Sequence, residues 1–235
     1  MKNPSPTRRE RVQQRERAIV AAAHEVFMER GFDGARMAEI ARRAKMAEGT
    51  IYLYFPGKEA LVRAVTGAFY ARLTQRAAAG VEGMQDLRVQ LEFLARHHLI
   101  SCLGEWRIIE LAAGTARTIE GYEGSEFFEY NKNYVAVFDG VFRQGVKSRE
   151  LRRDVSLSHV RDLFYGGLEY ACRTLMLRGH GPEDEETVTA ARRLVDLVCD
   201  GVIRREGRNR ISDDQVVSVT RRLERVASKL ERLSG

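Results

Sequence analysis

Apolar residues recur at helical spacing along most of the chain, and no stretch shows the apolar-polar alternation of a half-buried strand. After residues 1–11, the apolar positions fall three and four residues apart and form one stripe. The stripe consists of Ile19, Ala22, Ala23, Val26 and Phe27. Gly31 then provides a usual stop signal for a helix. The pattern predicts an almost wholly α-helical fold.

Two short helices are predicted next, in a segment that ends at the pair Pro56-Gly57. The inner face of the first is formed by Met37, Ile40, Ala41 and Ala44. Residues 45–47 form the turn. The second helix runs over residues 48–55, with Ile51 and Phe55 one turn apart and facing inward. Two short helices joined by a tight turn are typical of a helix-turn-helix.

Longer helices are predicted beyond this segment, because three of the four prolines lie within the first 56 residues. Glycines and a polar stretch at 148–156 mark the breaks between them. The predicted helices span residues 58–78, 86–102, 104–115, 124–147, 157–178 and 184–206.

A separate amphipathic helix is predicted in the tail, residues 207–235. Its apolar residues step by three and four positions, which is the a/d seam of a heptad repeat. They are Val216, Val219, Leu223, Val226, Leu230 and Leu233. The seam covers nearly three heptads, so two interpretations stay open: a helix that packs on its own subunit, or a short coiled coil between chains.

Charge is distributed unevenly along the chain. Residues 1–58 hold 12 Lys/Arg against 7 Asp/Glu, whereas the other 177 residues hold 27 against 26. The basic excess therefore coincides with the helix-turn-helix and predicts an anionic partner there. No run of about 18 apolar residues exists to span a membrane. The N-terminus also lacks the apolar core of a signal peptide, so a cytoplasmic location is expected.

The sequence shows no metal-ligand or disulfide spacing, and it implies no cofactor, no metal and no catalytic residues. Its three cysteines are far apart among apolar neighbours and are interpreted as core residues: Cys102, Cys172 and Cys199. The nearest thing to a cluster is His97-His98 beside Cys102. Adjacent histidines point to different sides of a helix, so one is expected to be buried and the other exposed. A helical enzyme is thus the weaker hypothesis.

The second short helix presents a polar face that suits DNA. Glu48, Gly49 and Tyr52 lie near its N-terminus, the end that meets base edges in a helix-turn-helix. Glu48 accepts from a cytosine amino group in this interpretation, or else pairs with Arg36 or Arg42. Hydroxyls and cations beside the face suit phosphate oxygens. The predicted DNA-binding residues are Arg36, Ala47, Glu48, Gly49, Thr50, Tyr52, Tyr54 and Lys58. In the alternative, Tyr52 and Tyr54 merely fill a small core.

These motifs resemble the N-terminal domain of the TetR (tetracycline repressor) family over residues 17–65. The matching pieces are AAAHEVFMERGFDG and MAEIARRAKMAEGTIYLYFPGKEAL. The resemblance implies a homodimeric, all-helical transcriptional regulator, usually a repressor, that a small molecule in the C-terminal domain releases from DNA. Three residues depart from the family pattern. Arg36 and Ala47 replace helix-capping residues, and Lys45 replaces the turn glycine and is expected to adopt a left-handed conformation.

The C-terminal region carries most of the apolar mass, and its crowded aromatics are core residues or liners of a ligand cavity. The predicted ligand-binding residues are Trp106, Arg107, Glu110, Tyr134, Phe138, Tyr165 and Arg173. Residues 106–110, 127–130 and 145–154 show a looser resemblance to the fatty-acid-regulating, acyl-CoA-responsive branch of the TetR family. That resemblance implies a long apolar effector such as a fatty acyl-CoA. An efflux-type aromatic or cationic drug is the alternative.

The family resemblance also implies that the last two core helices, 157–178 and 184–206, pair across a twofold axis. Small residues would permit close approach there, and apolar ones would supply contact; alternatively they seal the core of one subunit. They are Gly166, Gly167, Leu168, Ala171, Leu175, Leu194, Leu197, Val198 and Val202. A dimer would place two recognition helices roughly 34–36 Å apart, as a palindromic operator requires.

The chain is predicted to have four parts: a flexible basic arm (1–11), a helix-turn-helix domain (12–57), a ligand-binding and dimerisation domain (58–206) and a C-terminal amphipathic helix (207–235). The leading hypothesis is a ligand-gated, DNA-binding homodimer without a membrane partner. A ligand-binding or scaffolding protein without specific DNA binding is the second hypothesis, and a helical enzyme is the third.

Overall fold

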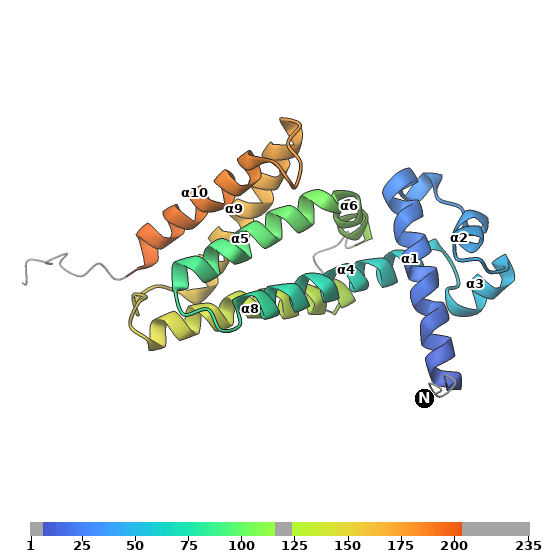
Figure 1. The fold of residues 1–235 in the computed structure, drawn as a ribbon, viewed down its shortest axis with the longest axis horizontal. Helices are drawn as coiled ribbons and strands as arrows, with labels where there is room; N and C mark the ends of the chain where they lie inside the picture. Colours follow the sequence, from blue (N-terminus) through green and yellow to red (C-terminus); the bar gives the residue numbers. More distant parts are fainter. Residues whose placement is uncertain (1–6, 116–123, 204–235) are drawn as a thin grey trace, which may run out of the picture. The chain divides into compact units, whose positions relative to one another are not determined.

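The computed structural model describes residues 7–115 and 124–203, which form nine α-helices and no β-strand (Figure 1). The prediction of an all-α fold is confirmed. The predicted heptad helix of residues 207–235 lies outside the described residues, as do residues 1–6 of the predicted arm.

The first helix, α1 (Arg8–Gly34), begins earlier than the pattern of apolar residues predicts. The Thr7 hydroxyl accepts a hydrogen bond from the Glu10 amide at 3.2 Å, and the Glu10 carboxylate accepts one from the Thr7 amide at 2.6 Å. This capping box satisfies two backbone donors that a helix start otherwise leaves unpaired. Residues 8–11 therefore belong to the helix, and the arm predicted over 1–11 is too long. Gly31, with φ of 67°, interrupts the helical geometry near the end of α1.

Helices α2 (Met37–Arg43) and α3 (Glu48–Tyr54) pack with α1 into a small N-terminal bundle. The predicted inward residues Ile40, Ile51 and Phe55 are buried, as is the whole predicted stripe of α1. The helical period therefore identified the core of this bundle correctly. Ala44, predicted on the same inner face, is only half-buried because α2 has already ended at Arg43.

The helix-turn-helix carries the local strain that its sequence predicts. Neither Arg36 nor Ala47 caps its helix with a side-chain hydrogen bond, and Lys45 in the turn has a φ of 55°. A left-handed backbone costs a residue with a Cβ roughly 1 kcal/mol more than it costs glycine. The two short helices are therefore held mainly by their buried faces.

Replacing Ala47 with serine should raise the free energy of unfolding by about 1 kcal/mol, because a hydroxyl at this position can accept a hydrogen bond from a free amide of α3. Urea denaturation of the full chain measures the gain. The exposed Ala38, inside α2, is a matched site: Ala38→Ser supplies the same hydroxyl where no cap is needed. Equal effects at both sites would contradict the capping argument.

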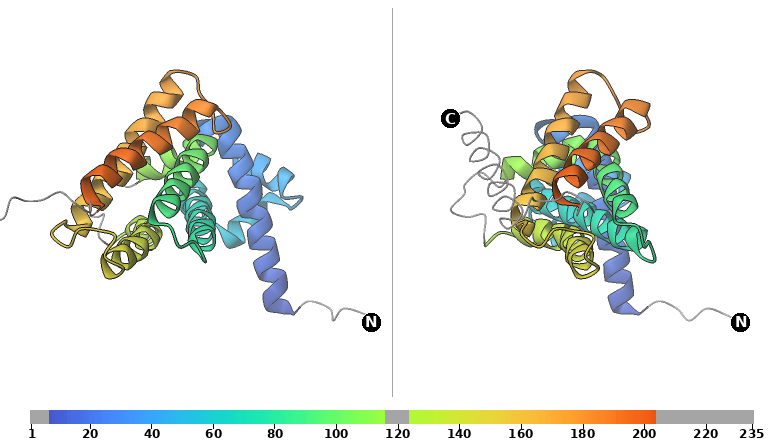
Figure 2. Two further views of the ribbon diagram at one scale, coloured as in Figure 1. Left: turned by 60° about the vertical axis from the view of Figure 1, so that its left-hand side comes forward. Right: turned by 90° about the vertical axis from the view of Figure 1, so that its left-hand side faces the viewer.

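Six helices follow in the described chain, and their bounds lie close to those predicted. They are α4 (Lys58–Val81), α5 (Leu87–Gly104), α6 (Trp106–Thr115), α8 (Glu126–Lys147), α9 (Leu157–Leu177) and α10 (Glu185–Val202). Helix α4 packs against α1 and also against α8, while α5 packs against α9 and α10 (Figures 1 and 2). The short helix α6 contacts both α1 and α4. Helices α4 and α6 are thus the elements that link the N-terminal bundle to the larger helical body.

Aromatic side chains from α8 and α9 form the centre of that body. The rings of Phe138 and Phe164 are fully buried, with centroids 4.8 Å apart. Tyr134 and Phe142 are buried beside them, whereas Tyr170 is exposed on the outer side of α9. All three cysteines are buried and free, which confirms that they are core residues.

Candidate DNA-binding helix and ligand cavity

Helix α3 has one buried and one open face. Ile51 is fully buried, whereas the side chain of Tyr52 is 48% exposed and that of Leu53 is 84% exposed. Glu48 and Gly49, one turn earlier, are also exposed. Tyr52 therefore does not fill the core, and the structure excludes that alternative. The exposed Leu53 lies next to Tyr52 in the chain and adds apolar surface to α3, and it was not among the residues predicted to bind DNA.

The residues beside this face differ in their exposure and in their hydrogen bonds. Thr50 and Tyr54 are half-buried, and Arg36 is exposed. Lys58, predicted to bind phosphate, donates a hydrogen bond to the Phe32 carbonyl at 2.8 Å and lies 4.4 Å from the centroid of the Phe32 ring. Lys58 thus braces the end of α1 in this structure, because the first turn of α4 lies against that end. A phosphate contact by its ammonium group stays a prediction.

Arg43 ties α2 to α1. Its guanidinium donates to the Glu29 carboxylate and lies 3.6 Å from Glu25 and 3.3 Å from Glu39. The hydrogen bonds that Arg43 donates to Glu29 are the main cause of the raised pKa of Arg43. Arg42 lies 3.8 Å from Glu39, which the sequence analysis had not considered as its partner. These ion pairs fix α2, which carries no side-chain cap, against the longer helix.

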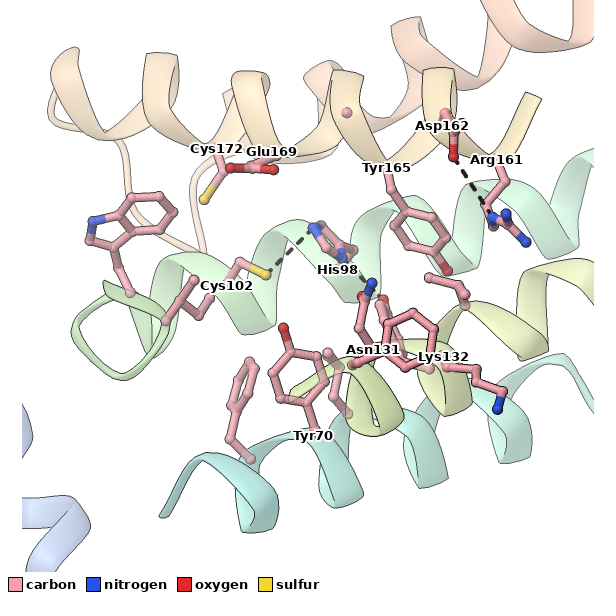
Figure 3. A pocket seen from close by; sticks show the side chains of 18 residues that line it. Tyr70, His98, Cys102, Asn131, Lys132, Arg161, Asp162, Tyr165, Glu169 and Cys172 are labelled. Atoms are coloured by element: carbon pink, nitrogen blue, oxygen red, sulfur yellow. Dashed lines mark hydrogen bonds and ion pairs between the residues drawn. The ribbon is translucent and has the colours of Figure 1, made fainter. Parts of the chain in front are cut away.

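A cavity of about 540 Å³ lies among α4, α5, α6, α8 and α9 (Figure 3). Its volume falls within the range of small-molecule sites, roughly 300–1,000 Å³. Three of the predicted ligand-binding residues line it: Trp106, Tyr134 and Tyr165. Apolar and aromatic side chains from α4 cover one side, including Phe69 and Tyr70. The cavity therefore has the composition of a site for a largely apolar molecule.

The other four predicted ligand-binding residues lie elsewhere, and that part of the prediction needs correction. Arg107 points to α1, where it donates to the carbonyls of Met28 and Glu29. Phe138 is part of the solid core, and the exposed Glu110 is not among the lining residues. Arg173 pairs with Glu169 at 2.9 Å and lies outside the lining, 5.9 Å from the Trp106 ring. Each of these helices packs against several neighbours, so sequence spacing did not identify the face that meets the cavity.

The sequence analysis missed a polar chain inside the cavity. The ring of His98 shares one hydrogen bond with the Tyr134 hydroxyl, at 3.1 Å from Nδ1, and another with Cys102, at 3.5 Å from Nε2 (Figure 3). Burial lowers the pKa of His98 to about 4 and raises those of Cys102 and Tyr134, so all three are uncharged near neutral pH. The His97-His98 pair beside Cys102 was the signal that could have found it.

The two histidines do point to different sides of α5, as predicted. His97 shares a hydrogen bond with the Leu73 carbonyl of α4 at 2.9 Å. Both residues are half-buried, however, so the expectation of one buried and one exposed histidine is wrong. The reason is that α5 is central and has neighbouring helices on more than one side.

The corner between α5 and α6 connects the cavity to the N-terminal bundle, and both belong to one compact unit that ends at Val202. Glu105 accepts hydrogen bonds from His24 of α1 at 2.7 Å and from Arg72 of α4 at 2.8 Å. Partial burial raises the pKa of Glu105, but these two hydrogen bonds outweigh it and lower the pKa overall. The next residue, Trp106, lines the cavity, and the one after it, Arg107, binds α1. Of these three consecutive residues, Trp106 lines the cavity, whereas Glu105 and Arg107 bind α1.

Comparison with known proteins identifies the N-terminal domain. The model of the bacterial regulatory proteins of the tetR family matches residues 19–65, which span the helix-turn-helix. The N-terminal bundle therefore has the sequence of a tetR-family domain. A relative from Bacillus subtilis, the fatty acid metabolism regulator protein, is 21% identical over 184 residues, which cover 78% of this chain and 93% of that protein. Relatives of this kind are helix-turn-helix transcriptional regulators that bind DNA, and not enzymes.

Solved structures of tetR-family regulators share the fold. The regulator FadR from Bacillus subtilis, in complex with stearoyl-CoA, superposes with a TM-score of 0.67 at 21% identity and covers 79% of this chain and 98% of its own. The ketosteroid regulator KstR2 of Mycobacterium tuberculosis gives a TM-score of 0.58 at 18% identity, with 82% of this chain and 96% of its own covered. These likenesses establish that the tetR-family architecture extends beyond the matched N-terminal domain.

Metal sites and membrane-spanning helices are two other features that the described residues could contain. Within residues 7–115 and 124–203, no cluster of three or more His, Cys, Asp or Glu side chains could hold a metal ion. None of the described helices is long and apolar enough to cross a membrane.

Proposed function

We propose that this protein is a ligand-responsive transcriptional repressor of the tetR family that binds a palindromic operator as a homodimer. A small, largely apolar effector in the cavity releases it from DNA. The observation that carries the proposal is the corner at residues 105–107, where a cavity-lining tryptophan stands between two residues that bind the N-terminal bundle. A DNA-binding regulator of this kind would act in the cytoplasm.

The exposed face of α3 is the proposed reading surface for DNA. Gly49 permits close approach of the backbone, and Tyr52 and Leu53 supply contacts to base edges and thymine methyl groups. Arg36, Thr50 and Tyr54 stand beside them and are suited to phosphate oxygens. Ala47 and Glu48 begin the helix at the end that enters the groove. Lys58 would add a phosphate contact only by sharing its ammonium group with Phe32.

Coupling between the two sites follows from the contacts of the corner. An effector that displaces Trp106 must also shift its neighbours Glu105 and Arg107, and with them the contacts that hold α1. Phe69, Tyr70 and Leu73 of α4 line the same cavity, so α4 would move too. The operator affinity then falls by the ratio of the effector's affinities for the two states, and the linkage is reciprocal.

The proposed effector class is a long apolar molecule such as a fatty acyl-CoA. Support comes from the apolar cavity, the likeness to a fatty acid metabolism regulator, and the likeness to a FadR that holds stearoyl-CoA. An aromatic or cationic drug is the alternative effector, and the aromatic lining would suit its ring system.

The proposed dimer interface is the outer face of α9 and α10. Leu163, Tyr170 and Leu177 follow one another at seven-residue intervals on α9, and Leu197 lies exposed on α10. Their exposed fractions, between 70% and 89%, are unusual for large apolar residues. Several residues predicted for this interface are instead used inside the subunit: Leu168, Leu175 and Val202 are buried, and Gly167 packs against Leu194. The pairing itself stays a proposal, with a different set of contact residues.

Selection of random duplex DNA on the purified full-length protein, at two salt concentrations, tests the function. We expect a palindrome whose half-sites lie about one helical turn apart, with an affinity that falls steeply as salt rises. Recovery of sequence-independent DNA alone, lost at the higher salt, would favour the ligand-binding or scaffolding hypothesis.

Replacing Glu105 with glutamine should weaken the communication between cavity and DNA while leaving the cavity intact. Loss of its charged hydrogen bonds to His24 and Arg72 should reduce the effector-induced change in operator affinity by about fivefold. Fluorescence anisotropy of labelled operator, with and without saturating octanoyl-CoA, measures this ratio.

The matched control for that experiment is Glu92→Gln. Glu92 lies on α5, the helix that ends just before Glu105, and pairs with Arg192 of α10 at 3.4 Å. Its substitution should leave the effector-induced change in operator affinity as it is in the unaltered protein. Equal loss in both variants would show that the ion pair of Glu105 serves general stability and not coupling.

A further inference from the structure

One polar group in the cavity wall has no partner. The hydroxyl of Tyr165 is buried. The Tyr134 hydroxyl is near enough to lower its pKa, but no group among the described residues meets the geometry of a hydrogen bond with it. Tyr165 extends from α9 into the cavity, opposite α8 and α4 (Figure 3). Leaving a buried hydroxyl unpaired is costly, and such groups in native proteins commonly mark a place where a ligand or water binds.

This hydroxyl lies beside the polar chain that begins at Cys102 and ends at Tyr134. The Cys102 thiol shares a hydrogen bond with His98, and His98 shares another with the Tyr134 hydroxyl. His98 therefore has a partner on both sides. The ring centroids of Tyr134 and Tyr165 lie 5.4 Å apart. The Tyr165 ring therefore packs against the last member of the chain without a hydrogen bond of normal geometry to it.

The titratable groups of the polar chain and of Tyr165 are uncharged, and the cations of the cavity lining are paired. Burial raises the pKa of Tyr165 and lowers that of His98 to about 4, so neither carries charge near neutral pH. The two cations of the described lining already have carboxylate partners: Arg161 lies 3.0 Å from Asp139, and Lys132 lies 3.4 Å from Glu129. A carboxylate placed against Tyr165 would therefore lack a counterion that is not already paired.

We propose that the Tyr165 hydroxyl binds a neutral oxygen, a carbonyl or a hydroxyl, of an otherwise apolar effector. The cavity would thereby select such molecules over both free carboxylates and plain hydrocarbons. A carboxylate would lose its hydration without compensation, and a hydrocarbon would leave the tyrosine unpaired. This inference rests on the proposed function, because it assumes that the effector occupies this cavity.

Four eight-carbon probes test the selection: 1-octanol, 2-octanone, octanoate and octane. Trp106 is the only tryptophan of the chain and lines the cavity, so its fluorescence reports binding to the intact protein without a label. At pH 7.5 we expect the alcohol and the ketone to bind about fivefold more tightly than octane, the effect of one neutral hydrogen bond. Octanoate should bind more weakly than either.

The variant Tyr165→Phe removes the hydroxyl and keeps the ring. It should abolish the preference for the alcohol and the ketone while octane binds as before or more tightly. Tyr130→Phe is the matched control, since Tyr130 is a half-buried tyrosine of α8 that lies outside the cavity lining. Its probe ranking should equal that of the unaltered protein.

The outcomes separate this inference from the proposed function. If the probes bind but Tyr165→Phe leaves their ranking unchanged, or if octanoate binds as tightly as octanol, the neutral-oxygen site is overturned while the cavity remains an effector site. If equilibrium dialysis confirms that none of the four binds, the cavity is not the effector site, and both proposals for it fail.

Discussion

Replacing Tyr52 with alanine should lower the affinity for the selected operator by about 100-fold, the largest effect expected from a single substitution on the DNA-binding surface. Half of this side chain is exposed on α3 while its neighbour Ile51 is buried, so the substitution leaves the core of the bundle intact. A contact to a base is worth roughly 1–2 kcal/mol, and a homodimer uses it once in each half-site. Fluorescence anisotropy with the selected duplex and with a scrambled duplex measures the two affinities.

The loss should be confined to the selected sequence. Tyr52 carries no charge, so binding to the scrambled duplex and the dependence of affinity on salt should stay nearly as they are in the unaltered protein. Arg36→Ala is the informative comparison, because removing an exposed cation should weaken both duplexes together and reduce the salt slope. An equal loss on both duplexes in Tyr52→Ala would show that the tyrosine positions the backbone and does not read bases.

Replacing Phe138 with alanine should lower the free energy of unfolding by about 3–5 kcal/mol, the cost of deleting a buried ring and leaving a cavity behind. The ring is completely inaccessible, and its centroid lies 4.8 Å from that of Phe164 and 5.8 Å from that of Tyr165. Urea denaturation at one fixed protein concentration measures the change, because association of subunits would otherwise add to the apparent stability.

The exposed Leu53 provides the comparison for that measurement. Leu53→Ala removes a large apolar side chain that is 84% exposed, and it should change the free energy of unfolding by less than about 0.5 kcal/mol. A loss of under about 1 kcal/mol in Phe138→Ala would contradict the solid core described here and would support the earlier prediction that Phe138 borders the ligand cavity.

The N-terminal bundle was largely predictable from its sequence. Ile19, Ile40 and Ile51 mark the three inner faces because a single amphipathic helix declares its buried side through the 3.6-residue period. The strain at Lys45 and the missing cap at Ala47 were equally visible, since both are properties of a few neighbouring residues. The capping box at Thr7 and Glu10 was visible in the same way but was overlooked.

The ligand site was only partly predictable, because its residues come together from five helices. Trp106, Tyr134 and Tyr165 were correctly expected to line it, as aromatic residues are common in such sites. Arg107 and Phe138 were not distinguishable from them by sequence, although one binds α1 and the other fills the core. A helix with neighbours on several sides buries more than one face, and its apolar period then no longer tells a core position from a cavity wall.

The sequence by itself thus determined the helical class, the bounds of most helices and the face that α3 presents to solvent, all of which depend on local spacing. Only the tertiary structure decided that Glu105 joins His24 and Arg72, and that the Tyr165 hydroxyl is buried beside a polar chain without a hydrogen bond of normal geometry among the described residues. The first of these contacts bridges 81 residues of the chain. Such contacts depend on how whole helices cross, and the packing of many side chains sets that crossing more than any short motif does.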